Sequence, residues 1–410
     1  MRVLIAGGGT GGHVFPGLAV AEELKKREKT TEIMFVGTEH GIEARIVPRE
    51  GFAIEFLRAE GFVGKSILKK IKAAAKAILS IKDAYSILKT FMPDIVIGVG
   101  GYASGAIVLI AHMKSIPTII HEQNSVPGLT NRILGRFVDR ICTTYQESLT
   151  FFPKHKTFLT GNPVRAKILK GEKDSAARLF SLEKDLFTVF VFGGSSGARS
   201  INRVIVNALN YMTDISEKIQ FLHQTGNQDY ESVRNAYRKA GFTGTVTPFI
   251  YQMAEAYAMA DVVVSRAGAT TLSEITALGK TSILIPYPFA AGKHQELNAM
   301  KLREMGAAFM ISDKELNGQT VAKYIKKIYE DDSVSADMQR ASRGLGRRDA
   351  CTKIADIAES LLREVGKTDS RGAPHSSSKP SGQSSLKEGR KQMSSLRKKK
   401  SMVMQHQVRK

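Results

Sequence analysis

The chain contains little of what marks disulfide-bonded, zinc-binding or membrane-spanning proteins. Among 410 residues there is no tryptophan, and the only cysteines are Cys142 and Cys351. Two thiols so far apart provide neither a disulfide framework nor the ligand spacing of a zinc site, so we expect a reducing compartment. No run approaches the roughly 18 consecutive apolar residues of a transmembrane helix, and no basic and then apolar leader precedes the first apolar run. We therefore expect neither export nor a membrane span.

The charge of the chain is strongly one-sided. Its formal net charge is +21, which points to an anionic partner such as nucleic acid, a phosphorylated substrate or acidic lipid. Much of this charge lies in residues 366–410, where 12 Lys and Arg face only Asp369 and Glu388. This Ser-rich segment has few large apolar side chains, so we expect a disordered basic tail. Its basic run at 397–400 is more typical of a solvated extension than of a specific binding site.

The rest of the chain has the pattern of an α/β protein. A hydrophobic content of 42% at this length is enough to bury a sizeable core. Short apolar runs alternate with helical stretches, and several runs lack polar alternation, as do strands covered on both faces of a parallel sheet. The strands that we expect lie at 2–6, 33–36, 95–99, 118–121, 140–143, 188–192, 219–224, 245–248, 262–265 and 281–285.

This βαβ pattern occurs twice, which predicts two doubly wound, Rossmann-like domains that face a cleft. Near the midpoint, Gly161-Asn162-Pro163 is a turn signal and marks a hinge. We place the first domain at residues 1–162 and the second at 163–342. A helix at about 343–365 is expected to pack back on the first domain.

A glycine-rich turn follows the first strand of each half. Residues 7–12 read Gly-Gly-Gly-Thr-Gly-Gly after the apolar run at 3–6, and residues 193–197 read Gly-Gly-Ser-Ser-Gly after the run at 189–192. Glycine allows the backbone to take positive φ and to approach a ligand closely, and the first N–H groups of the next helix face an anion. Two such turns at one cleft suit a nucleotide diphosphate, although either alone can be a plain strand-to-helix turn.

The first turn also fits a nicotinamide enzyme, because Gly7, Gly9 and Gly12 have the dinucleotide-binding spacing. The next strand disfavours that function, since it ends in Phe-Val-Gly-Thr at 35–38, where a ribose-binding acid is expected. His13 directly follows the turn. A histidine beside bound phosphate suits proton transfer, because its ordinary pKa is about 6.5, although a lone histidine at a helix start more often caps or packs.

Four longer motifs bring these features together. They read Gly-Gly-Thr-Gly-Gly-His-Val-Phe-Pro-Gly-Leu-Ala at 8–19, His-Glu-Gln-Asn-Ser-Val-Pro-Gly-Leu-Thr-Asn at 121–131, Gly-Gly-Ser-Ser-Gly-Ala-Arg at 193–199 and Ser-Arg-Ala-Gly-Ala-Thr-Thr-Leu-Ser-Glu at 265–274. In this order they closely resemble the MurG family, the bacterial peptidoglycan N-acetylglucosaminyltransferases. The resemblance runs from Met1 to about Val365 and leaves the basic tail uncovered.

This resemblance implies a GT-B glycosyltransferase fold and an inverting reaction. N-acetylglucosamine passes from UDP-GlcNAc to the 4-hydroxyl of the muramoyl sugar of lipid I, which yields lipid II and UDP in peptidoglycan synthesis. It also implies a peripheral enzyme on the cytoplasmic face of the bacterial cell membrane, a role in cell shape and cell division, and partners in a cell-wall synthesis complex. A related glycosyltransferase with another lipid acceptor, such as diacylglycerol, is the first alternative. A nonenzymatic anion- or RNA-binding protein is the second.

The resemblance also implies substrate-binding positions one by one. Ser195 matches a position on the diphosphate loop, Ile250 offers backbone groups to uracil, and Glu274 holds the ribose hydroxyls. Gln295 matches a contact to the sugar, although the segment before it differs in length by one residue from the family pattern. The complete set of matching positions is Thr10, Gly11, Gly12, Asn124, Arg165, Ser195, Ile250, Ala269, Thr270, Thr271, Leu272, Ser273, Glu274 and Gln295.

The chemistry of the residues agrees with this assignment. UDP leaves with two negative phosphates, and the chain has no Asp-x-Asp motif to hold a divalent metal, so we expect no metal and no cofactor. Loop amides and a helix N-terminus at residues 195–198 can meet that charge. The attacking hydroxyl needs a base, and His13 is our first candidate. Glu122 is the alternative base or an orienting partner, or else only a structural acceptor in its turn.

A lipid-linked acceptor requires contact with a membrane, and one segment suits that contact. From Lys65 to Lys89, seven lysines are interleaved with aliphatic residues and Tyr85, and Asp83 is the only acid. Basic amphipathic segments of this kind bind anionic lipid surfaces, although ordinary surface helices share the pattern. We expect membrane association through this segment. The chain has no aromatic and basic module of the nucleic-acid-binding kind, so we expect no specific nucleic acid partner.

Overall fold

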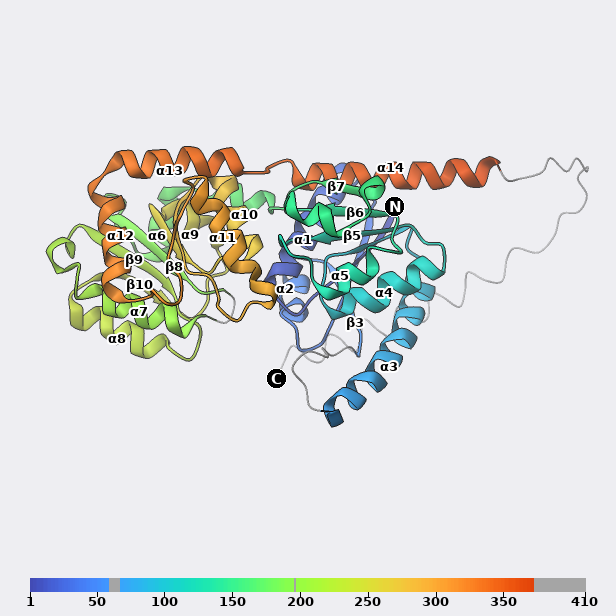
Figure 1. Ribbon diagram of the computed structural model, residues 1–410, viewed down its shortest axis with the longest axis horizontal. Coiled ribbons are helices and arrows are strands. Elements are labelled where there is room, and N and C mark those ends of the chain that lie inside the picture. Colours follow the sequence, from blue (N-terminus) through green and yellow to red (C-terminus); the bar gives the residue numbers. More distant parts are fainter. Residues whose placement is uncertain (59–66, 195–196, 372–410) are drawn as a thin grey trace, which may run out of the picture. The chain divides into compact units, whose positions relative to one another are not determined.

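The computed structural model describes residues 1–58, 67–194 and 197–371. Residues Met1–Val365 form one compact unit, which contains two β-sheets with helices on both faces of each (Figure 1). Both sheets are parallel throughout. The predicted pair of doubly wound domains is therefore confirmed. Among the helices in the described ranges, none has the length and apolar character that crossing a bilayer requires.

The first sheet comes from the N-terminal part of the chain and has the strand order β3-β2-β1-β4-β5-β6-β7. Its strands are β1 (Arg2–Ala6), β2 (Glu32–Gly37), β3 (Ala53–Phe56), β4 (Ile95–Gly98), β5 (Thr118–Glu122), β6 (Arg140–Thr143) and β7 (Thr157–Leu159). The accompanying helices are α1 (Gly11–Arg27), α2 (Glu43–Arg49), α3 (Ile67–Phe91), α4 (Tyr102–Met113) and α5 (Leu129–Leu134), with short 3₁₀ turns η1 (Glu147–Phe151), η2 (Lys154–Lys156) and η3 (Ala166–Lys170).

The second sheet repeats this plan in the order β10-β9-β8-β11-β12-β13. Its strands are β8 (Phe187–Phe192), β9 (Ile219–Gln224), β10 (Thr243–Thr247), β11 (Val262–Ser265), β12 (Thr281–Leu284) and β13 (Phe309–Met310). The helices are α6 (Lys173–Phe180), α7 (Arg199–Leu209), α8 (Tyr230–Ala240), α9 (Met253–Met259), α10 (Ala269–Leu278), α11 (His294–Glu304), α12 (Gly318–Glu330) and α13 (Asp332–Leu345), with η4 (Thr213–Ile215) and η5 (Ala291–Lys293).

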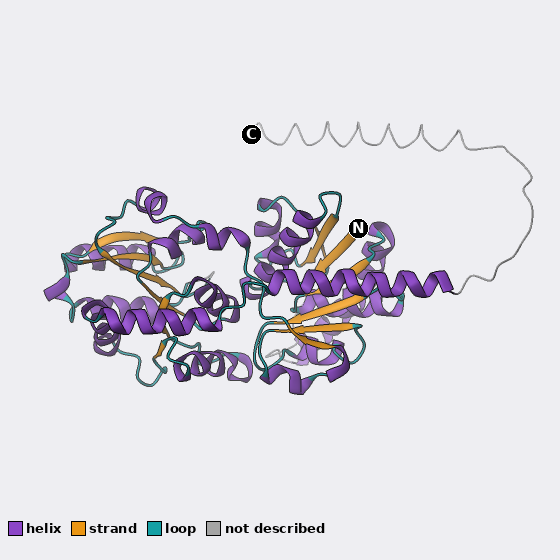
Figure 2. Cartoon of the chain, turned by 90° about the horizontal axis from the view of Figure 1, so that it is seen from above, coloured by secondary structure: helices purple, strands orange, loops and turns teal. Residues whose placement is uncertain are grey.

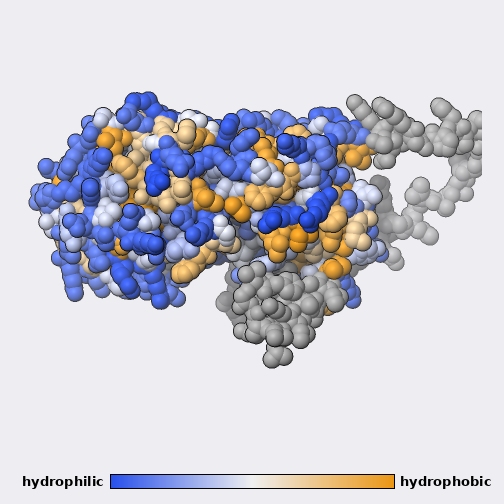
Figure 3. Space-filling view, in the orientation of Figure 1, coloured by the Kyte–Doolittle hydropathy of each residue, from blue (hydrophilic) through white to orange (hydrophobic). Residues whose placement is uncertain are grey.

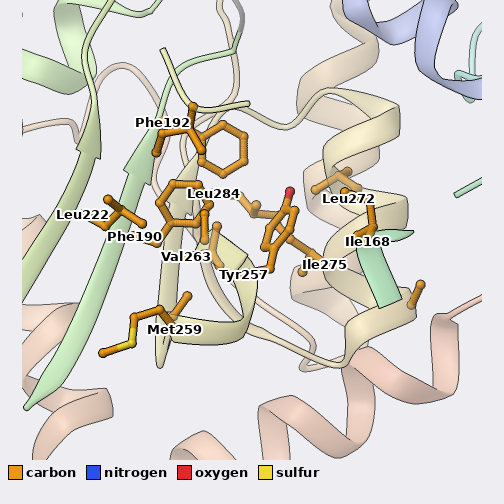
Figure 4. Packing of buried hydrophobic residues seen from close by; sticks show 14 of the residues in the cluster. Ile168, Phe190, Phe192, Leu222, Tyr257, Met259, Val263, Leu272, Ile275 and Leu284 are labelled. Carbon is orange, nitrogen blue, oxygen red and sulfur yellow. The ribbon is translucent and has the colours of Figure 1, made fainter. Parts of the chain in front are cut away.

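Alternate residues of the central strands point into different cores, which explains their unbroken apolar runs. On β8, Phe190 and Phe192 pack in one cluster, whereas the intervening valines lie in a cluster on the opposite face. Figure 4 shows the Tyr257 ring between these phenylalanines and Leu272 and Ile275 of α10. The core of the second sheet thereby fixes α10, whose N-terminal turn carries predicted site residues.

A last helix, α14 (Ala350–Arg371), returns from the second sheet to the first. Its Ile354 and Leu361 are buried in the same apolar cluster as Val3 of β1. Arg27 of α1 also forms an ion pair with Asp356, at 2.8 Å. Seen from above, α14 crosses in front of the strands of the first sheet (Figure 2). Residues 372–410 of the expected basic tail lie outside the described part of the chain.

Two buried histidines show how strongly the interior disfavours charge. His121 of β5 forms a hydrogen bond between Nε2 and the carbonyl of Gly161, at 3.1 Å. His223 of β9 lies between the Asn202 and Tyr237 side chains, at 3.1 Å from each. Burial lowers the pKa of His121 to about 4 and that of His223 to about 3. Both rings are therefore neutral in the folded chain near neutral pH.

We predict that the free energy of unfolding falls as the pH drops below about 6.5, because the unfolded chain then binds protons that the folded chain does not. By about pH 5 each of these histidines accounts for about 2 kcal/mol of the loss. Urea denaturation at about pH 7.5 and about pH 5 measures it. His223→Gln should shrink the difference between the two pH values, whereas His40→Gln, at an exposed position, should leave it unchanged. An equal difference in His223→Gln and wild type would contradict the argument from burial.

Candidate functional site

A cavity of about 1090 Å³ opens where the two sheets meet. In each sheet the strand order reverses beside the first strand, between β1 and β4 and between β8 and β11. Doubly wound folds bind ligands at this switch point, outside the carboxyl ends of the strands. The walls of the cavity accordingly include Gly11 after β1, Gly193 after β8 and Gly268 after β11.

Most of the predicted site residues lie together in this cavity. Thr270 at the start of α10 donates a hydrogen bond from Oγ1 to the carbonyl of Gly12, at 3.2 Å. This bond joins the predicted donor segment to the first glycine turn across the cavity. The predicted residues that line it are Thr10, Gly11, Gly12, His13, Asn124, Arg165, Ile250, Ala269, Thr270, Thr271, Glu274 and Gln295.

Three predicted residues occupy other places, and Ser195 lies outside the described residues. Leu272 is buried in the core of the second sheet, because it faces inward one turn along α10. Ser273 donates from Oγ to the carbonyl of Ala269, at 2.9 Å, within the same helix. Neither side chain lines the cavity, so the stretch from Ala269 to Glu274 contributes its first three members and Glu274 rather than all six.

Glu122 is the third residue that does not line the cavity. Its side chain is 1% exposed. One carboxylate oxygen accepts from the Asn124 backbone N–H at 2.9 Å, and the other accepts from Gly128 N–H at 3.1 Å and from the Asn131 amide at 2.9 Å. These bonds hold the turn that presents Asn124 to the cavity. The arrangement favours the structural role for Glu122 over the role of base.

His13 has the geometry of a base. Its Nδ1 lies 3.0 Å from the carbonyl oxygen of Gly8, and because a carbonyl can only accept, Nδ1 carries the proton and donates it. Nε2 of the neutral ring therefore keeps its lone pair. Burial lowers the pKa of His13, although the carboxylates of Glu122 and Glu43 oppose this change. The ring is thus neutral and able to accept a proton near neutral pH.

A pair of glycines that the sequence motifs did not identify packs against His13 and the Gly8 carbonyl. Gly100 and Gly101 follow β4 with φ of +93° and +82°, values that favour glycine. A Cβ at Gly100 would lie 2.8 Å from Cδ2 of His13, and a Cβ at Gly101 would lie 2.6 Å from the carbonyl oxygen of Gly8. The signal was present as Gly-Val-Gly-Gly at 98–101, directly after an apolar strand.

The opposite wall carries several cations, of which Arg165 is buried, and the buried acid Glu274. The Arg165 guanidinium lies over the Phe15 ring, 4.3 Å from its centre, and donates to Glu50 at 3.4 Å. Its buried Nε has no hydrogen-bond partner among the described residues. Glu274 accepts from the Tyr257 hydroxyl at 2.8 Å, and burial raises the pKa of its carboxyl while Arg165 opposes that rise. Both side chains can still form bonds with a ligand.

Gln224 links the second glycine turn to the Ile250 loop and was also missed. At the end of β9, its amide donates to the carbonyl of Gly194 at 2.8 Å and accepts from the Ile250 N–H at 2.8 Å. The Ile250 N–H therefore has a protein partner already. A mid-chain glutamine in an apolar strand gives no sequence signal of this role.

Gln295 lies at the first turn of α11, and its carbonyl oxygen accepts from the Tyr287 N–H at 3.0 Å, which leaves its NH₂ group for a ligand. Within residues 1–58, 67–194 and 197–371, no group of three or more His, Cys, Asp or Glu side chains is placed to hold a metal ion. The polar groups that line the cavity include backbone amides, the guanidinium groups of Arg49, Arg165, Arg199 and Arg266, the Lys167 ammonium, the imidazoles of His13 and His294, and several hydroxyls, side-chain amides and carboxylates.

Two family models match the chain. Residues 3–143 match the N-terminal domain of glycosyltransferase family 28, and residues 188–361 match its C-terminal domain. A relative from Thermodesulfovibrio yellowstonii, the UDP-N-acetylglucosamine–N-acetylmuramyl-(pentapeptide) pyrophosphoryl-undecaprenol N-acetylglucosamine transferase, is 50% identical over 88% of this chain and 99% of its own. A relative of the same name from Myxococcus xanthus is 44% identical over 88% of this chain and 93% of its own.

Solved structures agree with the sequence matches. The crystal structure of Acinetobacter baumannii MurG is similar with a TM-score of 0.68 and 28% identity, over 88% of this chain and 99% of that one. The Neisseria meningitidis UDP-GlcNAc 2-epimerase bound to UDP-GlcNAc has a TM-score of 0.63 and 14% identity, over 88% and 100%. The second likeness concerns the fold alone.

We predict that Gly100→Ala moves the His13 ring away from the Gly8 carbonyl, because the new methyl would overlap the ring. Nitrogen-15 chemical shifts of the histidine ring measure the change, and the population with a proton on Nδ1 should fall. Gly241→Ala is the matched control, since Gly241 also has positive φ, at +72°, but no atom lies within 4 Å of an added Cβ. An unchanged His13 tautomer in Gly100→Ala would show that the ring is held by other contacts.

Proposed function

Because the chain belongs to glycosyltransferase family 28, we propose that it transfers N-acetylglucosamine from UDP-GlcNAc to the 4-hydroxyl of the muramoyl sugar of lipid I, which yields lipid II and UDP. The observation that carries the proposal is the cavity itself. A neutral histidine from the first half of the chain faces an anion-binding turn, a guanidinium and a buried acid from the second. These are a base and a site for a nucleotide diphosphate, held in one space.

The donor occupies the wall formed by the second sheet. Gly197 and Ala198 line the cavity just before α7, where helix N–H groups attract the diphosphate. Arg165 adds positive charge and an unpartnered donor. Glu274, held by Tyr257, accepts from the ribose hydroxyls, and the amide of Gln295 contacts the sugar. The uracil ring of the donor lies at the Ile250 loop. There the Ile250 carbonyl can bind uracil, whereas the Ile250 N–H is already bonded to Gln224.

The acceptor approaches from the wall formed by the first sheet. Its 4-hydroxyl oxygen attacks the anomeric carbon on the face opposite UDP, the bond from that carbon to the phosphate oxygen breaks, and the hydroxyl proton passes to Nε2 of His13. Inversion of the linkage follows from this single displacement. Thr10 directly precedes α1, and Gly11 and Gly12 begin it beside His13, so their amides are placed to meet the acceptor phosphates and the donor phosphates next to them.

We predict that the purified full-length protein converts radiolabelled UDP-GlcNAc and a lipid I analogue into labelled disaccharide lipid, with and without a chelator. His13→Ala should lower kcat by roughly 10²- to 10⁴-fold, the usual contribution of general base catalysis. It should leave UDP-GlcNAc binding largely intact, because most of the proposed donor contacts come from the other wall and Asn124, the donor contact on this wall, is unchanged.

The alternatives give distinct results in the same assay. Release of UDP without labelled lipid would preserve the donor site and assign a different acceptor. Absence of both turnover and UDP binding would contradict the proposal. Full turnover of His13→Ala with normal donor binding would remove His13 from the role of base.

The enzyme docks on the cytoplasmic face of the cell membrane through α3 and the end of α4. Lys65 and the side chains of residues 67–78 lie outside the described part, but the exposed apolar side chains of the described part include Ile81 at 45%, Tyr85 at 50% and Met113 at 71% exposure. Lys114 lies over the Tyr85 ring at 4.4 Å. Arg58 donates a hydrogen bond to the Asp83 carboxylate at 2.9 Å. This pairing neutralises the acid, so Asp83 reduces the positive potential of the lysines little. Figure 3 shows hydrophobic and hydrophilic side chains side by side over α4 and α5.

We predict that replacing Ile81, Tyr85 and Met113 together by glutamate abolishes sedimentation with vesicles that contain anionic lipid, because both the apolar contact and the positive potential are lost. Replacing exposed Tyr211 and Met305 by glutamate is the control, since these lie beside the second sheet. Equal sedimentation of both variants and wild type would contradict this face. Loss of transfer to membrane-bound acceptor without loss of donor binding would support it.

A further inference from the structure

A buried carboxylate with no part in the chemistry above lies directly behind the first glycine turn. Glu43 begins α2 and is 1% exposed. One of its oxygens accepts from the N–H of Thr38 at 2.9 Å and from the Thr38 hydroxyl at 2.8 Å, and the other accepts from the N–H of Gly9 at 2.8 Å. All three donors are neutral. Burying a carboxylate among neutral donors is costly.

The surrounding backbone leaves space for this side chain alone. An added Cβ would lie 2.1 Å from a Glu43 oxygen at Gly8, 2.1 Å at Gly41, and 2.4 Å from Cγ at Gly37. A methyl group at any of the three would displace the carboxylate. Three glycines from three different segments therefore converge on one acid, which is more than the start of a short helix requires.

The carboxylate reaches His13 through a single peptide group. The N–H of the Gly8–Gly9 peptide donates to Glu43, and the carbonyl of the same peptide accepts from Nδ1–H of His13 at 3.0 Å. Hydrogen bonds arranged in a chain polarise one another. The order carboxylate, peptide, imidazole is that of an acid that orients a histidine base, with one peptide inserted between them.

We propose that Glu43 is a positioning residue for the base: resting on the proposed function, it acts through the Gly8–Gly9 peptide to fix the His13 tautomer and to strengthen Nε2 as proton acceptor. The negative charge favours the imidazolium that forms as the acceptor hydroxyl loses its proton. Burial lowers the pKa of the His13 ring, the hydrogen bond to the Gly8 carbonyl and the charges of Glu122 of β5 and Glu43 of α2 raise it, and His294 of α11 lowers it. His121 of β5 also lies close enough to interact with the ring.

Removal of the negative charge of Glu43 should therefore change the pKa of His13 in a known direction. Glu43→Gln keeps the size of the side chain, but His13 loses a nearby negative charge and its pKa falls. The acidic limb of the pH profile of kcat/KM should move down by about half to one pH unit. A weaker base also lowers kcat, by about threefold to tenfold, while KM for UDP-GlcNAc stays within about twofold.

A double-mutant cycle separates positioning from general support of the fold. In the His13→Ala background, Glu43→Gln should cause no further loss of kcat, because Glu43 acts only through the imidazole. A further loss as large as that seen with His13 present would overturn the proposal. Asp139→Asn is the matched control, since Asp139 accepts from the N–H and hydroxyl of Thr118 just as Glu43 does from Thr38. That variant should leave the pH profile unmoved.

Two further measurements keep the test decisive. NMR titration of His13 in wild type and Glu43→Gln does not depend on turnover, so it distinguishes failure of this proposal from failure of the proposed function. An unchanged His13 pKa would overturn the proposal whatever the transfer assay gives. Should Glu43→Gln not fold, Gly41→Ala displaces the carboxylate instead. It should lower kcat in the wild-type background and not in His13→Ala, and the opposite result would contradict the inference.

Discussion

Where the parallel strands end, the backbone groups of the following turns lose their partners in the sheet, and the site depends on how side chains satisfy them. Gln123 donates to the carbonyl of Val99 at 2.8 Å, and Ser104 adds a second donor, at 2.7 Å, to the carbonyl of Ala6, which also accepts from the Val99 N–H. Gln224 donates to the carbonyl of Gly194, and Glu43 accepts from Gly9. All four side chains are buried. They fix the ligand-binding turns before any ligand arrives, which is the preorganisation that electrostatic catalysis needs.

In the proposed reaction the two halves divide the work. The first would present the base and the acceptor site, and the second would present the donor site. Contacts that join them include hydrogen bonds from Thr270 to Gly12, from Arg165 to Glu50 and from the Ser125 N–H to Asn298 at 3.3 Å, and the Arg49 guanidinium also lies over the Tyr251 ring, 3.8 Å from its centre. Arg165 bridges the two halves, because its guanidinium lines the cavity and also pairs with Glu50, directly after α2 of the first half.

The sequence predicted the central strands of each sheet and the edge strand β10, and it missed the other three edge strands. Central strands such as β4 and β11 are buried on both faces and read as continuous apolar runs. The edge strands β3, β7 and β13 are short and only half-buried, so their residues carry no such pattern. At the site, contiguous motifs led to His13 and Glu274. Glu43 and Gln224 were missed because their role depends on atoms brought together by folding, and a carboxylate at a helix start usually faces solvent.

A crystal structure of the protein with UDP-GlcNAc tests the account most directly. The account predicts the diphosphate at the start of α7 beside Arg165, the ribose on Glu274, and the anomeric carbon facing Nε2 of His13 with room for an attacking hydroxyl. A donor whose diphosphate lies instead on the turn at residues 7–12, against His13, would contradict it. In that case the histidine would be a phosphate ligand, and the base would have to be sought elsewhere.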